Sequence, residues 1–368
     1  MRIAILGPVL WDSIWGHGQE LTRILSKKHE IAYIEPVVHS SKLRLSFQRT
    51  AKNPIPKNTS IIMRHTSLGL SPFYVIYTEI KNILDIYRQN YDILITYYTT
   101  CALLATIFSR IMGKKVILIY ADDLAELYEP KLAKILTKYF FTPLVASFSN
   151  SIVATAQKLK ESIEKYNKKV KYIPNGANLS FFKTKNSLKD SKFVICFVGA
   201  FGDWINFDII INTANEFKND ENIKFLLVGD GENFEDIQRK IDEFSLKNIE
   251  LTGAMPHSQI PEILSKVDIC VIPFNVTPLT DRVSPVKLFE YWAMGKPVIS
   301  TSFYEIRKIA KDKVIFADSS EEFKTSIMNF KNDEKLCEKY GKIGLQEVKN
   351  YDWNVLGKRY LKLIQDLR

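Results

Sequence analysis

The sequence has few cysteines and no long hydrophobic run. Its four cysteines, Cys101, Cys196, Cys270 and Cys337, lie far apart and form no CxxC pair. We therefore expect reduced core thiols in a cytoplasmic protein, not a disulfide framework or a zinc site. The most apolar stretch, 140–156, contains Thr, Pro, Ser and Asn, so we do not expect it to cross a membrane. Residues 1–12 lack a cleavage-type site, and we interpret 2–6 as a first buried strand instead of a signal peptide.

Several phosphate-binding and catalytic motifs are also missing. The sequence contains no GxGxxG, no GxxxxGK[ST] and no GxSxG. An NAD site, a P-loop and the nucleophile elbow of a serine hydrolase are therefore disfavoured. With 368 residues, of which 46% are hydrophobic and 25% charged, the chain is typical of a globular protein with two or three domains.

Acidic residues are under-represented only in the first half. Residues 1–180 carry a surplus of 11 basic side chains, whereas 181–368 have a net charge of −1. The stretch 39–59 holds five basic residues and no acid, and 131–147 spaces three lysines as on a basic amphipathic helix. Three interpretations remain open: a solvated surface, an anionic membrane face or phosphate-bearing lipid, and a nucleic acid. No RNA- or DNA-binding motif supports the third.

Short apolar runs alternate with helical stretches along the whole chain. Strands are predicted at 2–6, 30–34, 60–63, 93–96, 116–120, 151–154, 170–173, 193–198, 224–228, 249–252, 269–273 and 298–300. Helices are predicted at 18–28, 72–89, 101–112, 207–217, 234–244, 258–266, 285–293 and 321–330. This alternation indicates an α/β protein with two doubly wound parallel sheets and a boundary within 174–192. We assign the domains to 1–178 and 179–354. Ligands of such sheets bind at the carboxyl ends of the strands, here in the cleft between the domains.

The segment 279–300 is the most informative. Ser284 is predicted as the N-cap and Pro285 as the first residue of a short helix that ends at Gly295. Arg282 and Lys287 lie near the positive end of this helix, where an anion such as a diphosphate would be stabilised. Glu290, two turns further, is placed to accept hydrogen bonds from a ribose diol. The alternative is that these three charges are ordinary surface residues.

Glycines follow three successive strands of the second half. The loops are 198–203, 228–232 and 252–257, and the glycines proposed to approach a ligand are Gly199, Gly202, Gly229 and Gly253. In the first half, Gly16 and His17 open a helix and are candidates to face the same cleft. Asp122 follows the predicted strand 116–120 and is a candidate to bind substrate hydroxyls. It lacks the supporting ligands that a metal site needs.

The motifs together resemble those of retaining GT-B glycosyltransferases, the large class that includes bacterial polysaccharide and glycolipid transferases. The resemblance rests on SPVKLFEYWAMGKPVIS, FVGAFGDWINFDIIINTA, FLLVGDGE, IELTGAMPHSQIPEILSKVDICVIPF, YIPNGANLSFF and WGHGQELTRILSKKHEIAYIEP. It implies two facing Rossmann-like domains with donor and acceptor in the interdomain cleft. It also implies that a final helix, about 355–368, crosses back onto the first domain.

The resemblance implies a role for individual residues. Glu290 corresponds to the ribose-binding glutamate, Leu288 and Phe289 meet the diphosphate through their backbone, and the loop with Met255 and Pro256 lies where the base stacks. Two departures stand out. Arg282 occupies the position of the family's first motif glutamate, and the loop after strand 193–198 lacks the usual cations. Asn178 replaces the aspartate of an NGxD motif.

The function expected from this reading is transfer of a sugar from a nucleoside-diphosphate sugar to a hydroxyl acceptor. Arg282, Lys287 and Asp122 are the expected catalytic side chains, and no metal or other cofactor is expected. The acceptor is a glycan or a lipid-linked molecule, met in the cytoplasm or peripherally on an anionic membrane face. The alternatives are a nucleotide-sugar epimerase of the same fold and a non-catalytic protein that binds sugar nucleotides or glycans. A nucleic-acid partner is not expected.

Overall fold

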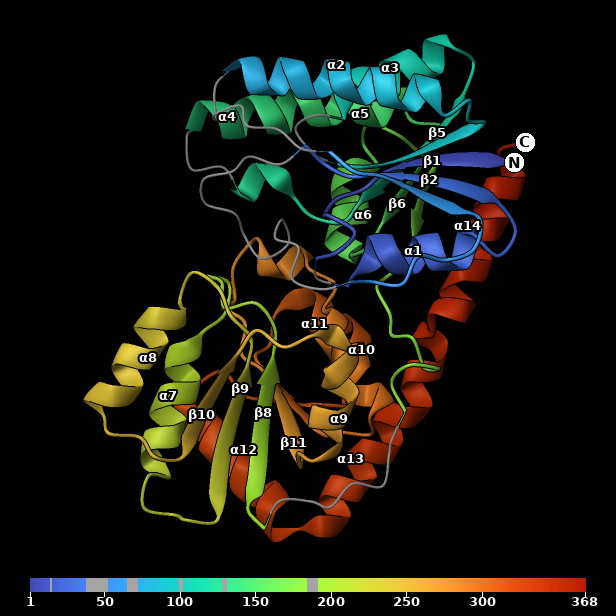
Figure 1. Cartoon of the computed structure of the whole chain (residues 1–368). Coiled ribbons are helices and arrows are strands. Elements are labelled where there is room, and N and C mark those ends of the chain that lie inside the picture. Colours follow the sequence, from blue (N-terminus) through green and yellow to red (C-terminus); the bar gives the residue numbers. More distant parts are fainter. Residues whose placement is uncertain (14, 38–51, 65–71, 99–101, 128–130, 184–190) are drawn as a thin grey trace. The chain divides into compact units, whose positions relative to one another are not determined.

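The computed structural model describes residues 1–13, 15–37, 52–64, 72–98, 102–127, 131–183 and 191–368 (Figure 1). The chain forms two compact units. Unit 1 consists of Met1–Pro174, Arg282–Ser284 and Leu356–Arg368. Unit 2 consists of Asn175–Asp281 and Pro285–Val355. Each unit is built on one parallel sheet and is described separately below.

The sheet of unit 1 has seven parallel strands in the order β3-β2-β1-β4-β5-β6-β7. Their bounds are β1 Arg2–Leu6, β2 Glu30–Ile34, β3 Thr59–Ile62, β4 Ile93–Tyr97, β5 Lys115–Tyr120, β6 Ser151–Ala154 and β7 Val170–Tyr172. The central strands β1, β4 and β5 are mostly Ile, Leu and Val, and they are buried except at the first residues of β1 and β5, Arg2 and Lys115. Burial on both faces is what a doubly wound sheet covered by helices requires.

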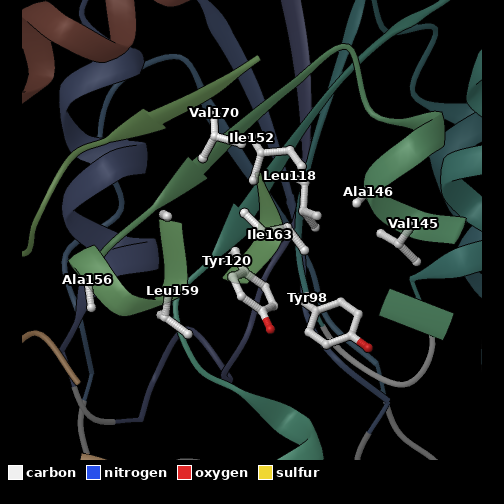
Figure 2. Close-up of a cluster of buried hydrophobic side chains, with 11 residues drawn as sticks. Tyr98, Leu118, Tyr120, Val145, Ala146, Ile152, Ala156, Leu159, Ile163 and Val170 are labelled. Atoms are coloured by element: carbon white, nitrogen blue, oxygen red, sulfur yellow. The ribbon is translucent and has the colours of Figure 1, made fainter. Parts of the chain in front are cut away.

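Two clusters of buried side chains join four of the helices of unit 1 to this sheet. The helices are α1 (His17–Leu25), α2 (Pro72–Arg88), α3 (Leu103–Ile111), α4 (Lys131–Leu136), α5 (Thr142–Phe148), α6 (Gln157–Ile163) and most of α14 (Trp353–Asp366). One cluster joins α2 and α3 to the central strands. The other, shown in Figure 2, joins Val145 and Ala146 of α5 and Leu159 and Ile163 of α6 to neighbouring strands, including Leu118 of β5. Helices α2, α3, α5 and α6 therefore cover the same face of the sheet.

The sheet of unit 2 has six parallel strands in the order β10-β9-β8-β11-β12-β13. The strands are β8 Phe193–Val198, β9 Ile223–Val228, β10 Ile249–Gly253, β11 Ile269–Ile272, β12 Val298–Ser300 and β13 Ile315–Phe316. The helices are α7 Phe207–Glu216, α8 Phe234–Glu243, α9 Ile260–Ser265, α10 Val286–Ala293, α11 Tyr304–Ala310, α12 Ser320–Asn332 and α13 Glu334–Glu347. Every recorded pairing between its strands is parallel, so the loops that follow β8, β9 and β10 emerge at one edge.

The predicted α/β class with two Rossmann-like sheets is confirmed, and the main errors concern helix boundaries. The stretch predicted as one basic amphipathic helix, 131–147, is helical from Lys131 to Phe148, and a π-helical turn that was not predicted lies within it, between α4 and α5. Helix α10 begins at Val286, so the predicted N-cap at Ser284 is wrong by one residue. Pro285 is the N-cap, because its ψ of 101° is extended and not helical. The two-residue strand β13 and helices α6, α11 and α13 were not predicted.

The cysteines are consistent with reduced thiols where the structure describes them. Cys196 and Cys270 are free and buried on adjacent strands, and burial raises the pKa of the Cys196 thiol to about 12. Cys337 is free and half-buried, whereas Cys101 lies outside the described residues. Most of the basic stretch 39–59 also lies outside them.

Candidate functional site

Three of the predicted glycines meet at the carboxyl edge of the unit 2 sheet. The Gly199 amide donates to the Val228 carbonyl at 2.9 Å, and the Gly229 amide donates to the Gly253 carbonyl at 3.0 Å. Gly229 has a φ of +149°, and a Cβ at this position would lie 1.8 Å from the Gly199 carbonyl oxygen. Only glycine allows the loops after β8 and β9 to approach so closely. The three glycine loops therefore meet at this edge of the sheet, as the sequence predicted.

The first turn of α10 has no side-chain cap. The N-cap of this eight-residue helix is Pro285, which has no polar side chain and so makes no side-chain capping hydrogen bond. Within the helix, the Leu288 amide donates back to the Pro285 carbonyl at 3.2 Å. Uncapped N–H groups and the positive end of the helix dipole together favour an anion at this position.

Lys287 lies against the glycine loop after β8. A Cβ built on Gly199 would lie 2.0 Å from the Lys287 Cε, so the lysine stem fills the space that a side chain would occupy there. Its ammonium group is 5.7 Å from the centre of the Phe197 ring. Desolvation lowers the pKa of Lys287, and the charge of Glu290 partly opposes this effect. A desolvated cation beside uncapped amides is a suitable partner for a phosphate group.

Glu290 lies on the same helix, about one turn after Lys287. Its Oε1 atom lies 3.4 Å from Nε2 of His257, which is long for a hydrogen bond. The His257 ring stacks on Phe181 with centroids 4.9 Å apart and contacts Phe182 edge-on. His257 was not among the predicted site residues, although it directly follows the predicted loop residue Pro256. This ring restricts the positions that the Glu290 carboxylate can take.

The other residues predicted for the site in unit 2 differ in how far they are exposed. Leu288 and Phe289 are fully buried, so only their backbone can meet a ligand. Met255 and Pro256 are exposed in the loop after β10. Gly202 is required by its neighbour, because a Cβ there would lie 2.4 Å from the Trp204 ring.

Arg282 and Ser284 belong to the short segment that clusters with unit 1. The Arg282 guanidinium donates to Asp123 at 2.7 Å and to Glu126 at 3.4 Å. Burial raises the pKa of Asp123, and the charge of Arg282 opposes this. The positive charge of Arg282 is thus already matched by two carboxylates, which disfavours its predicted role as a phosphate-binding cation. Ser284 is buried and lies one position before the N-cap residue of α10, which is Pro285.

Two further candidates in unit 1 are Asp122, in the loop after a strand, and His17, at the start of a helix. Asp122 is exposed two positions after the end of β5. His17 begins α1, and its Nδ1 and Nε2 atoms lie 2.5 Å and 2.9 Å from the hydroxyl oxygens of Tyr97 and Tyr360. Burial lowers the pKa of His17 to about 3, so the ring is neutral at physiological pH. These contacts favour a structural role for His17, which joins α14 to α1, over the predicted contact with a ligand.

Gly16, the other residue predicted with His17, is the N-cap of α1. Its amide donates to the Gln19 side chain at 3.1 Å. Within the described part of the chain, no group of three or more His, Cys, Asp or Glu side chains is arranged to hold a metal ion. A search of the same residues finds no helix with the length and hydropathy needed to span a bilayer.

Comparison with known proteins identifies relatives of the chain. Residues 180–347 match the family model described as glycosyl transferases group 1. The putative teichuronic acid biosynthesis glycosyltransferase TuaH of Bacillus subtilis (strain 168) is 25% identical over an alignment covering 58% of this chain. That alignment covers 56% of TuaH, so the match spans little more than half of the relative's length.

Solved structures share the fold along the whole chain. Anabaena HepE in complex with UDP and glucose superposes with a TM-score of 0.77 at 13% identity, covering 99% of both chains. Sucrose-phosphate synthase from Thermosynechococcus elongatus gives a TM-score of 0.72 at 15% identity, covering 100% of this chain and 98% of the other. The chain therefore has the GT-B fold that the sequence motifs predicted.

Proposed function

We propose that the chain transfers a sugar from a nucleoside-diphosphate sugar to a hydroxyl acceptor, because residues 180–347 match the family model described as glycosyl transferases group 1. One observation carries the proposal more than any other. The uncapped N-terminus of α10, the desolvated Lys287 against Gly199, and the carboxylate of Glu290 lie together on one short helix and its neighbouring loop. The helix N-terminus and Lys287 suit the diphosphate of a nucleoside diphosphate, and the Glu290 carboxylate suits its ribose hydroxyls.

The proposed chemistry uses the charges of this set. The diphosphate lies at the first turn of α10, where the backbone amides and Lys287 stabilise the negative charge that develops as the glycosidic bond breaks. The Glu290 carboxylate accepts hydrogen bonds from the ribose hydroxyls. The base lies beside the exposed loop of Met255 and Pro256. The positive charge comes from the protein, so the proposed reaction needs no metal ion, and no protein nucleophile is assigned.

The similar proteins support a specific class of sugar donor and of acceptor. Binding of UDP by HepE supports a uridine diphosphate sugar as the donor. The name of TuaH supports an acceptor in the synthesis of an anionic polysaccharide. The surplus of basic residues in the first 180 positions suits a negatively charged or diphosphate-linked acceptor. We place the reaction in the cytoplasm, peripherally at an anionic membrane face.

The test of this function is the affinity for UDP and the turnover of UDP-sugars. Glu290→Gln keeps the size of the side chain and should weaken UDP binding while leaving the thermal midpoint unchanged. Glu243→Gln, an exposed position at the end of α8, is the matched control and should bind UDP like the wild type. Wild-type affinity in Glu290→Gln would refute the assignment. UDP binding with neither transfer nor hydrolysis of any UDP-sugar would identify a binding protein and not an enzyme.

A further inference from the structure

The outer face of unit 1 exposes an unusual number of large apolar side chains. Helix α2 packs beside α3, and α3 packs beside α5, on one face of the sheet. We define the α2–α5 surface by the exposed apolar side chains of these elements, which are Ile76, Tyr77, Ile80, Leu84, Tyr87, Leu104, Ile111, Met112, Leu132, Ile135, Leu136, Tyr139, Phe140, Phe141 and Phe148. They account for most of the exposed large hydrophobic residues in the described chain. A concentration of this kind marks a surface that contacts an apolar phase.

The charges on these elements have one sign. The basic residues of α2, α3, α4, the π-helical turn and the residues that follow α3 are Lys81, Arg88, Arg110, Lys114, Lys115, Lys131, Lys134 and Lys138. The only acidic residues in the same elements are Glu79 and Asp85, and both are buried. Glu79 accepts hydrogen bonds from the first amides of α3, and Asp85 pairs with the buried Arg64 and also with Lys81 and Arg88. Lys134 pairs with Glu126, which precedes α4. The surface therefore presents apolar side chains together with an excess of basic ones, among them Lys131 and Lys138.

A π-helical turn at Thr137–Phe141 (η3) places three aromatic residues outward in succession. The Thr142 amide and hydroxyl both donate to the Thr137 carbonyl, and the Thr142 hydroxyl also contacts that of Tyr98. Thr137 and Thr142 are buried, whereas Tyr139, Phe140 and Phe141 are 65%, 53% and 39% exposed. In a regular α-helix the residue one turn after Thr137 would be Phe141, which would then point inward. The five-residue turn buries Thr142 in its place and releases Phe141 to the surface.

We propose that the α2–α5 surface binds the interface of an anionic lipid bilayer. Aromatic and aliphatic side chains with flanking lysines are the composition of segments that lie in the boundary between headgroups and acyl chains. The cationic side chains complement an anionic leaflet. The buried side of α5, through Val145 and Ala146, is fixed to the sheet, as Figure 2 shows. The surface is therefore a preformed part of the fold.

A second copy of the chain is a poorer partner for this surface. A two-fold symmetric dimer would place the same patch against itself, so that its lysines and arginines would face one another. Juxtaposed like charges oppose association, whereas an anionic bilayer neutralises them. The proposal deepens the proposed function, because a membrane-bound enzyme would take a lipid-linked acceptor, and that consequence depends on the transferase activity. Binding to vesicles can be measured without it.

The test is flotation of the full chain with vesicles of phosphatidylcholine alone or with about one-third phosphatidylglycerol. The wild type should float with the anionic vesicles at low salt and be released at high salt. Phe140→Ser/Phe141→Ser should reduce binding strongly, and Lys131→Gln/Lys138→Gln should reduce it by about fivefold for each lysine removed. Phe244→Ser and Lys342→Gln, exposed positions in unit 2, are the matched controls and should bind like the wild type.

Three results would overturn the proposal. The first is failure of the wild type to float with anionic vesicles, and the second is equal binding to both vesicle types. The third is a wild-type dimer in light scattering that Phe140→Ser/Phe141→Ser converts to a monomer, which would assign the surface to a second copy. UDP binding by the patch variants separates the two proposals. It should remain at the wild-type level, since its loss would indicate a folding defect and not a missing membrane contact.

Discussion

Replacing Lys287 with methionine should separate binding of the donor from stability of the fold. The lysine stem lies in the space beside Gly199, and methionine has a stem of similar length without the charge. Desolvation lowers the pKa of Lys287, which means that the folded state disfavours its charged form. Lys287→Met removes that unfavourable term and keeps most of the packing. The midpoint of thermal unfolding should therefore stay constant or rise.

The loss in binding follows from the hydrogen bond that the ammonium would make. A hydrogen bond to a charged group contributes about 1.5–3 kcal/mol, which corresponds to a roughly 10- to 150-fold change in the dissociation constant. Lys287→Met should weaken the binding of UDP by this factor. Uridine lacks the diphosphate, so its affinity should hardly change.

Isothermal titration calorimetry and differential scanning fluorimetry provide the two readouts. Lys240→Met, an exposed position in unit 2, is a control for the general loss of a positive charge. The reasoning is refuted if Lys287→Met lowers the thermal midpoint and leaves the UDP affinity intact. It is also refuted if uridine and UDP lose affinity equally, since the lysine would then act away from the phosphates.

Three further perturbations test neighbouring parts of the account. Gly199→Ala should displace the Lys287 ammonium and weaken UDP binding about as much as Lys287→Met does. The double variant should lose little further affinity for UDP. Additive losses of affinity in calorimetry would contradict the contact between Gly199 and Lys287. The pKa of His17 falls from 6.5 unfolded to about 3 folded; its contribution to stability is therefore complete above about pH 6.5 and falls by up to about 1.4 kcal/mol per pH unit below it. Urea unfolding at about pH 7 and pH 5 should show a shallower pH dependence for His17→Asn than for the wild type. Arg282→Gln should lower the unfolding free energy by about 3 kcal/mol by leaving buried Asp123 unpaired, and Arg282→Gln/Asp123→Asn should recover part of it; a neutral single variant would contradict the pairing.

The fold was largely predictable because its signals are local. Buried parallel strands are continuous runs of β-branched and aliphatic residues, and strands such as β1 and β8 begin and end where the sequence indicates. Glycines directly after β8 and β9 and at the end of β10 indicated the edge at which the loops meet. Strand β13 was missed because two residues carry no periodic pattern. The π-helical turn between α4 and α5 was not predicted because such a turn has no distinct hydrophobic period.

The candidate site was predictable where backbone rules decide it and not where tertiary contacts do. The position of Lys287 and Glu290 on a short helix followed from the sequence. The pairing of Arg282 with Asp123 spans 159 positions, and that of His17 with Tyr360 spans 343. No local pattern could reveal either pairing, and both give a predicted site residue a structural contact that the sequence did not indicate. The same applies to His257, whose stacking on Phe181 depends on the fold of unit 2.

The most direct test of the central claim is a crystal structure of the full chain with UDP. Phosphate density is expected at the amides of Val286 and Lys287, with the Lys287 ammonium in contact with it and the ribose hydroxyls at Glu290. Density for the diphosphate away from the first turn of α10, with Lys287 unmoved against Gly199, would contradict it.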